Sequence, residues 1–305
     1  MRVHVRVPAT TANLGPGFDA LGLALDLWNE TIWTPTRDGK IRVTISGEGE
    51  DILPADATNR VVAVALSLYD RVGVTCEGLR VHCINRIPLG SGLGSSSAAI
   101  VSGLLGANAL LGEPLSREEI LQRAIETEGH PDNVAPAMLG GLVVSVLHNG
   151  QVVSIKLPAR APRAPLRATV VLPKFEFPTE YARSILPRTV DRQDAIFNIS
   201  RAILVAEALR TGDVDLLGKV MDDRLHQPYR LPLIPGALAA IEAARRAGAA
   251  AVALSGAGPS LIAFSRDGNP EIGEAMRREF ERAGLEARVF HLCISEQGAR
   301  VHRKG

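Results

Sequence analysis

The sequence predicts an α+β fold in two domains. Candidate strands and helices mix in both halves of the chain, without the regular strand–helix alternation of a doubly wound parallel sheet. The length of 305 residues is enough for two domains, each with its own core. Residues 158–165 read PARAPRAP, with three prolines and no apolar side chain larger than alanine. We therefore expect domains at 1–157 and 166–305, joined by a linker at about 158–165.

Apolar patterning places the elements of the first half. Val3, Val5 and Val7 share one face of a strand at 2–7. The almost wholly apolar stretch 95–111 predicts a buried helix. A capping box, Ser116 with Glu119, opens a further helix that ends near 128. The remaining elements expected are strands at 22–34, 41–46 and 79–83, a helix at 59–72, and a hairpin of 142–147 and 152–157 around an Asn-Gly turn.

The second half mixes helices with fewer strands. The elements expected there are a strand at 168–172, several helices between 179 and 247, two strands around SGAGPS, a helix at 270–283 and a last strand at 287–293. Because apolar runs stay well short of the roughly 20 residues that a membrane helix needs, we expect no membrane span.

The composition argues against several classes of protein. The net charge is +1, and Lys and Arg gather densely only in the short stretch 300–304, so a broad nucleic-acid-binding face is not expected. Cys76, Cys83 and Cys293 are odd in number and show no CxxC pairing, so neither a disulfide framework nor a zinc site is indicated. The first ten residues lack the apolar core of a signal peptide. These features predict a cytoplasmic protein.

The segment 88–97, PLGSGLGSSS, carries the clearest chemical signal. Gly90, Gly92 and Gly94 let the backbone turn tightly and approach a ligand closely. The serines at 95–97 then open a helix whose first amides have no intrahelical partner. These amides and the helix dipole suit a polyphosphate. The Walker A sequence GK[ST] does not follow, and an ordinary loop with a serine cap is the alternative interpretation.

A second candidate loop, 8–25, follows the first predicted strand. Residues 15–20 satisfy the dinucleotide pattern G-x-G-x-x-A. However, Pro16 and Asp19 fit a binding loop better than the opening of a helix, so we favour a binding loop that also carries Asn13. A structural turn is the alternative.

Acidic, imidazole and amide side chains crowd the segment 126–133, ETEGHPDN. Pro131 is expected to stop the helix before it. Glu126 is a candidate ligand for Mg²⁺, a hard cation that prefers carboxylate oxygens and water. A solvated glutamate at a helix end is the alternative.

Two features of the second half complete the set of candidates. The turn 254–260, LSGAGPS, has small residues that permit close approach of the backbone, although a plain hairpin turn would look the same. Thr179 and Arg183 lie one turn apart on a predicted helix, and Arg230 lies within HQPYRLPLIPG. Arginine forks suit carboxylate recognition, although a lone arginine is more often part of a surface ion pair.

Together these motifs resemble those of the GHMP kinases. Four motifs occur in that family's order over nearly the whole chain: PATTANLGPGFDALGLAL, PLGSGLGSSSAA, EGHPDN and LSGAGPS. Two segments resemble those of the branch of the family that phosphorylates the hydroxyl of L-homoserine, namely EGHPDNVAP and HQPYRLPLIPG. The resemblance implies an N-terminal domain like domain 2 of ribosomal protein S5, a ferredoxin-like C-terminal domain, an active site between them, and ATP and Mg²⁺ as cofactors.

The resemblance also implies roles for individual residues. Asn13 and Asp19 would meet the reacting hydroxyl, and Thr179 would lie beside the transferred phosphoryl group. Arg183 and Arg230 would clamp the substrate carboxylate. The pocket-lining residues implied are His130, Asp132, which would face the substrate ammonium, and Asn133.

The nucleotide and metal ligands are implied in the same way. Mg²⁺ would be held by Ser96 and Glu126, with Ser95, Ser97 and Glu128 as alternatives. The implied ATP-binding residues are Pro88, Leu89, Gly90, Ser91, Gly92, Leu93, Gly94, Ser95, Ser96 and Ser97. A supporting glycine loop would consist of Gly256, Gly258 and Ser260.

Asn133 departs from several relatives, which carry a candidate catalytic aspartate in that place. Because an amide cannot accept the proton, we expect catalysis mainly by positioning and charge stabilisation, with Asp19 as the alternative base. The rival functions are a kinase for a mevalonate-type alcohol and an RNA-binding module. The sequence leaves the oligomeric state open, a homodimer included.

Overall fold

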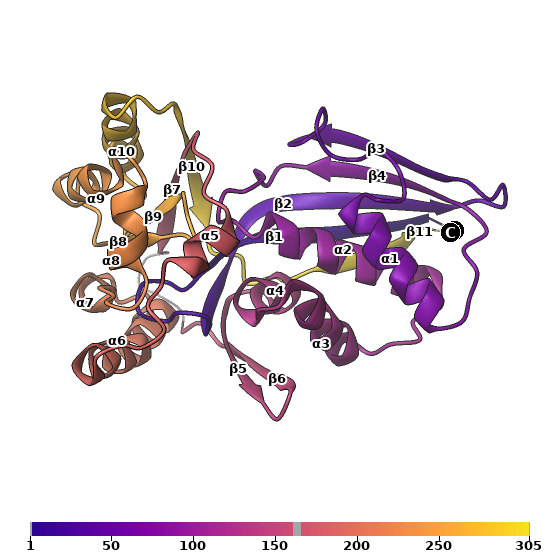
Figure 1. Ribbon diagram of the computed structural model, residues 1–305, viewed down its shortest axis with the longest axis horizontal. Helices are drawn as coiled ribbons and strands as arrows, with labels where there is room; N and C mark the ends of the chain where they lie inside the picture. The colour runs from indigo at the N-terminus through magenta and orange to yellow at the C-terminus, as the bar shows by residue number, and fades with distance from the viewer. Residues whose placement is uncertain (1, 161–165, 305) are drawn as a thin grey trace.

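The computed structural model describes residues 2–160 and 166–304. It has two sheets, which lie toward opposite ends of an elongated molecule. The smaller sheet and the helices of the second half are at the left of Figure 1. The α+β class and the two-domain arrangement predicted from the sequence are confirmed.

The larger sheet has the strand order β11-β1-β2-β4-β3, and β5 and β6 extend it from β2. Only β3 and β4 pair in parallel among the strand pairs of the described residues. The strands are β1 (Arg2–Ala12), β2 (Leu21–Pro35), β3 (Ile41–Gly47), β4 (Leu79–Asn85), β5 (Leu142–His148), β6 (Gln151–Leu157) and β11 (Arg300–Lys304).

Strand β1 runs five residues further than predicted. Its register with β2 shifts between Pro8 and Ala9, where proline has no N–H for the ladder, and pairing then resumes through Ala12. Thr10 and Thr11 are therefore fully buried strand residues, not loop residues, and the polar loop begins at Asn13.

Four helices cover one face of this sheet (Figure 1). They are α1 (Arg60–Arg71), α2 (Ser95–Leu110), α3 (Arg117–Glu128) and α4 (Pro131–Leu139). The helix α2 is buried along almost its whole length, as its composition predicted.

Helix α4 was not predicted, because Pro131 was interpreted as a helix stop. The structure shows the opposite: Gly129, in the left-handed conformation with φ 90°, ends α3, and Pro131 begins α4. Proline suits the first helical position because its missing N–H would have no partner there and its φ is already helical.

The smaller sheet is antiparallel, in the order β10-β7-β9-β8. Its strands are β7 (Arg167–Pro173), β8 (Ala251–Leu254), β9 (Leu261–Ser265) and β10 (Ala287–Cys293). The helices of this half are α5 (Thr179–Ser184), α6 (Arg192–Thr211), α7 (Val214–Val220), α8 (Gln227–Arg230), the 3₁₀ turn η1 (Leu231–Leu233), α9 (Ala237–Arg246) and α10 (Pro270–Arg282).

The two faces of the smaller sheet belong to different cores. One face packs on α9 and α10 around Val171, Ile241 and Phe280. The other face, with Val170 and Phe264, joins α6, α7 and the core of the larger sheet. The two domains are therefore joined by continuous apolar packing.

The C-terminal end departs from the predicted boundary at 166–305. Residues 300–304, expected as a short basic tail, form β11 and pair antiparallel with β1 in the N-terminal sheet. Of the predicted linker, 158–160 follow β6, and 161–165 lie outside the described residues. None of the helices in the described residues is long and apolar enough to cross a membrane.

Candidate active site

A cavity of about 490 Å³ opens where the two domains meet. It is lined by the loops after β1, β4 and β7, by the first turn of α2, the end of α3 and the start of α4, by α5 and Arg230, and by the β8–β9 turn. The predicted site residues that line it are Asn13, Leu89, Gly90, Ser91, Gly92, Gly94, Ser95, Ser96, Ser97, Glu128, His130, Asp132, Asn133, Thr179, Arg183, Arg230, Gly256 and Gly258.

The loop before α2 presents its backbone to this cavity. Gly90, Gly92 and Gly94 all have φ between 59° and 76°, a region that favours glycine. Ser91 closes the loop by donating from Oγ to the carbonyl of Pro88 at 2.7 Å. The first turn of α2 has no side-chain cap, so its free amides and the positive end of its dipole are available to an anion.

Two of the ten predicted ATP-binding residues do not line the cavity. Leu93 is fully buried in the N-terminal core, and Pro88 holds Ser91 through its carbonyl. Gly94 is confined by the protein itself, because a Cβ there would lie 2.0 Å from Oγ1 of Thr10.

The carboxylate beside this loop is Glu128, not Glu126. Glu128 accepts hydrogen bonds from the hydroxyls of Ser96 at 2.8 Å and Ser97 at 2.9 Å. It also pairs with Arg60 at 3.1 Å. Glu126 instead accepts from Gln122 at 3.1 Å and lines a separate surface hollow beside β6. Residues two apart on a helix point to nearly opposite sides, so only one of the two can face α2.

The loop after β1 is held in an unusual backbone conformation. Asn13, Leu14 and Asp19 all have positive φ, which is uncommon outside glycine and accumulates at functional sites. Asn13 donates from Nδ2 to the carbonyl of Gly256 at 2.8 Å, and its Oδ1 accepts from the amide of Asp19 at 3.0 Å. The loop is thereby tied to the β8–β9 turn.

Asp19 forms a two-bond ion pair with Arg183, at 2.7 and 2.9 Å. Both side chains are partly exposed, and of the two only Arg183 lines the cavity. The hydrogen bond to Asp19 raises the pKa of Arg183 above its usual value. Arg183 therefore stays charged. Two residues predicted to contact the substrate, Asp19 and Arg183, are thus bonded to each other.

Arg230 is almost fully buried behind them. Its Nε donates to the carbonyl of Ala182 at 3.0 Å. Burial, with the nearby charge of Arg183, lowers the pKa of Arg230 to about 10, still far above neutrality. The guanidinium consequently presents a fixed positive charge at the cavity wall.

The start of α4 supplies the opposite charge. Nδ1 of His130 lies 2.9 Å from Oδ1 of Asp132, and that hydrogen bond raises the pKa of His130. Asp132 is buried and lines the cavity. Asn133 accepts from the hydroxyl of Thr10 at 2.8 Å.

The β8–β9 turn supports the loops through a residue that sequence reasoning missed. Ser255 donates to the carbonyl of Gly92, at 2.8 Å, and lies 2.9 Å from Oγ1 of Thr11. Ser260, predicted as part of this support, is buried, and its hydroxyl finds no hydrogen-bond partner among the described residues. A small hydroxyl in a Gly/Ser turn gives no signal of which serine faces the loop.

A second cavity, of about 290 Å³, adjoins the loop on its other side. It is lined in part by Asn29, Thr31, Asn59, Arg60 and Ser102. Asn59 caps α1 by accepting from the amide of Val61. Asn59 also lies beside a cavity large enough for a ligand, and no local pattern in the sequence indicates this.

Comparison with known proteins assigns the family. The family GHMP kinases N terminal domain matches residues 59–141, and GHMP kinases C terminal matches 205–282. The homoserine kinase of Moorella thermoacetica is 47% identical to this chain, over 97% of it and 99% of the relative. The chain belongs to the GHMP kinases. This GHMP kinase is also 42% identical to the homoserine kinase of Carboxydothermus hydrogenoformans, over 97% of the chain and 96% of that relative.

The same kinase has a close match among solved structures. The crystal structure of homoserine kinase from Cytophaga hutchinsonii superposes with a TM-score of 0.87 at 33% identity, covering 99% of this chain and 97% of the other. The GHMP fold predicted from the motifs is confirmed for both domains.

Proposed function

We propose that this GHMP kinase transfers the γ-phosphoryl group of ATP to the hydroxyl of L-homoserine, giving O-phosphohomoserine for threonine biosynthesis in the cytoplasm. The observation that carries the proposal is the division of one cavity into two chemical ends. A loop with free helix amides occupies one end, and two arginines with a buried aspartate occupy the other.

The loop 88–97 would bind the phosphates of ATP. Its glycine backbone conformations and the open first turn of α2 provide N–H donors and a positive dipole end, the combination that binds polyphosphates without a Walker lysine. The adjoining cavity beside Asn59 has the place and size for the nucleoside part. The nucleotide would then run from that cavity across the loop into the substrate cavity.

The residues beside the loop fit a magnesium ion. Mg²⁺ in such sites is held by one or two carboxylates together with substrate phosphates and water, so a cluster of acidic residues is not required. Glu128, with the hydroxyls of Ser96 and Ser97 directed at its carboxylate, is the matching donor set, and we propose it in place of Glu126. When bound, the ion would neutralise charge on the β- and γ-phosphates.

The other end of the cavity matches an α-amino acid. Arg230 and Arg183 would bind the carboxylate, since a guanidinium matches it in shape and charge. Asp132 would accept from the ammonium. A mevalonate-type alcohol has no ammonium, so it would make no such contact and would leave the buried Asp132 with His130 as its hydrogen-bond partner.

The reacting hydroxyl would lie near Asn13, Asp19 and Thr179. Both carboxylate oxygens of Asp19 already accept hydrogen bonds from Arg183. Because phosphoryl transfer has a loose transition state, positioning and charge stabilisation can supply most of the rate enhancement. The proton can leave late, to a phosphoryl oxygen or to water.

An assay of ADP release tests the function. With ATP and Mg²⁺ present, we expect release to depend on L-homoserine and to be absent with mevalonate. Equal release with both alcohols, or none with homoserine, would contradict the proposed substrate.

A further inference from the structure

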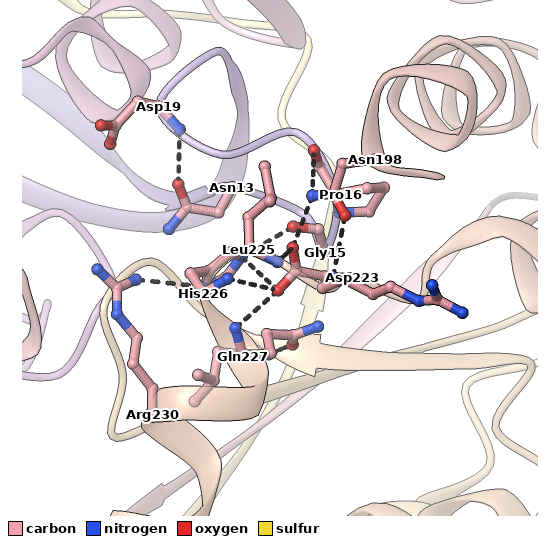
Figure 2. A network of polar contacts seen from close by, with 12 residues as sticks. Asn13, Gly15, Pro16, Asp19, Asn198, Asp223, Leu225, His226, Gln227 and Arg230 are labelled. Atoms are coloured by element: carbon pink, nitrogen blue, oxygen red, sulfur yellow. Dashed lines mark hydrogen bonds and ion pairs between the residues drawn. The ribbon is translucent and has the colours of Figure 1, made fainter. Parts of the chain in front are cut away.

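A buried polar network connects the C-terminal domain to the loop after β1 (Figure 2). Its centre is Asp223, whose carboxylate accepts from Nδ2 of Asn198 at 2.7 Å. The same carboxylate accepts from the backbone amides of Leu225 at 2.9 Å, His226 at 3.0 Å and Gln227 at 2.6 Å. These bonds fix the turn that leads into α8, so the position of the His226 backbone is closely determined.

The His226 side chain reaches from this turn in two directions. Its Nε2 lies 2.8 Å from the carbonyl oxygen of Gly15, and its Nδ1 lies 3.3 Å from a terminal nitrogen of Arg230. A carbonyl can only accept and a guanidinium can only donate. The ring must therefore be neutral, with its proton on Nε2 and the lone pair of Nδ1 toward Arg230. Complete burial favours the same neutral form by lowering the pKa of His226.

The Gly15 contact depends on a close approach of two backbones. Gly15 has φ of 72°, and a Cβ there would lie 2.1 Å from the carbonyl oxygen of Met221. Asn198 adds a second tie by donating to the carbonyl of Pro16 at 3.2 Å. The loop that carries Asn13 and Asp19 is thus seated on the network, as Figure 2 shows.

Arg230 is held by two of its three nitrogens. Nε donates to Ala182 and Nη1 to His226, and among the described residues Nη2 makes no hydrogen bond. Phe18 lies over the guanidinium at 5.3 Å and stacks on the His226 ring at 5.1 Å. The bond to His226 therefore decides the direction in which the remaining donor of Arg230 points.

We infer that His226 is a positioning residue for the carboxylate end of the substrate: it accepts from Arg230 and donates to Gly15, and so sets the guanidinium against the loop of Asn13 and Asp19. The inference rests on the proposed function. The charged groups facing the ring are Asp223 on its own turn, Arg230 on α8 and Asp19 on the loop.

Two conservative variants separate the contact of His226 with Arg230 from its contact with Gly15. In His226→Gln the amide can still donate near the former Nε2, so the Gly15 contact is kept while the acceptor for Arg230 is lost. In His226→Asn the acceptor near the former Nδ1 is kept and the Gly15 contact is lost. A bond to a charged group is worth about ten- to a hundredfold in affinity, so His226→Gln should raise the KM for homoserine about tenfold or more.

The experiment measures KM for homoserine, for its carboxylate-free analogue 2-amino-1,4-butanediol and for ATP, together with Tm. We expect His226→Gln to raise KM for homoserine alone. We expect His226→Asn to keep KM for homoserine near the wild-type value while lowering Tm. The control Phe280→Leu, in the α9–α10 core, should lower Tm without changing any KM ratio.

Two results would overturn the inference, and they differ. If the wild type releases ADP with homoserine but His226→Gln leaves the ratio of the homoserine and diol KM values unchanged, His226 is only structural. If the wild type shows no homoserine-dependent ADP release, the proposed function fails and the positioning role fails with it.

Discussion

Glu126 and Glu128 show how closely a site depends on single residues. The two glutamates are chemically alike and lie two positions apart on α3, yet only Glu128 faces the serines that open α2. The sequence segment ETEGHPDN identifies the region, but the phase of α3 selects the residue, and that phase is set by packing of Ile120 and Ala124 in the core.

Substitution at these two positions gives the first prediction. Glu128→Gln keeps the shape but removes the charge, so we expect kcat to fall at least tenfold and the Mg²⁺ concentration for half-maximal activity to rise. Glu126→Gln is the matched control and should stay near the wild type. Titration of Mg²⁺ in the ADP-release assay compares them, and the reverse ranking would return the metal site to Glu126.

The neutral His226 gives a pH prediction. Burial lowers the pKa of His226 in the folded state below its usual value of 6.5, so below about pH 6.5 the unfolded chain takes up a proton that the folded chain does not. The stability that His226 contributes is thus complete above pH 6.5 and is lost as pH falls toward the folded pKa, by at most about 1.4 kcal/mol per pH unit.

Urea unfolding of the wild type and His226→Gln at pH 7.5 and 5.5 measures this effect. Other titrating groups are common to both proteins and cancel in the difference. We expect the wild type's advantage to shrink at pH 5.5, and an advantage that grows at pH 5.5 would show that the ring is protonated in the folded state.

At the scale of elements, local patterns predicted best where one interaction decides the structure. The capping box of Ser116 and Glu119 is present in the structure, and the apolar stretch 95–111 is the buried helix α2. Prediction failed where a residue has two compatible roles. Pro131 can follow a helix or begin one, and the adjacent Gly129 decides in favour of α4.

The phosphate loop is best tested at Gly90. Gly94 is a poor choice, because a Cβ there meets Thr10 and would disturb the fold itself. A Cβ at Gly90 meets no protein atom within 4 Å, and this residue lines both cavities. Gly90→Val should therefore weaken ATP binding about tenfold or more through the lost backbone approach and the blocked space.

The matched control is Gly112→Val, which also has positive φ and open space but lies after α2, away from both cavities. Isothermal titration with a non-hydrolysable ATP analogue gives the affinities. Equal losses in the two variants would mean that backbone strain, not the phosphate loop, causes the effect.

For the whole molecule, the site exists only because two domains share a core and a network. The N-terminal sheet receives its edge strand β11 from the end of the chain. The loop after β1 is hydrogen-bonded to Gly256 and His226 of the other half. The family resemblance predicted that the site lies between the domains. It could not reveal the His226 network, because buried contacts between positions some 200 residues apart leave no local pattern.

In the proposed function, one cavity recognises an ammonium, a carboxylate and a hydroxyl together. The most direct measurement is kcat/KM for phosphorylation of L-homoserine, of 2-amino-1,4-butanediol, which lacks the carboxylate, and of 4-hydroxybutyrate, which lacks the ammonium, with the products followed by ³¹P NMR. The diol would lose the contacts of the substrate carboxylate with Arg230 and Arg183, and 4-hydroxybutyrate would lose the contact of the ammonium with Asp132. We therefore predict a loss of about a hundredfold or more for either analogue. Phosphorylation of all three alcohols at similar kcat/KM would contradict the account.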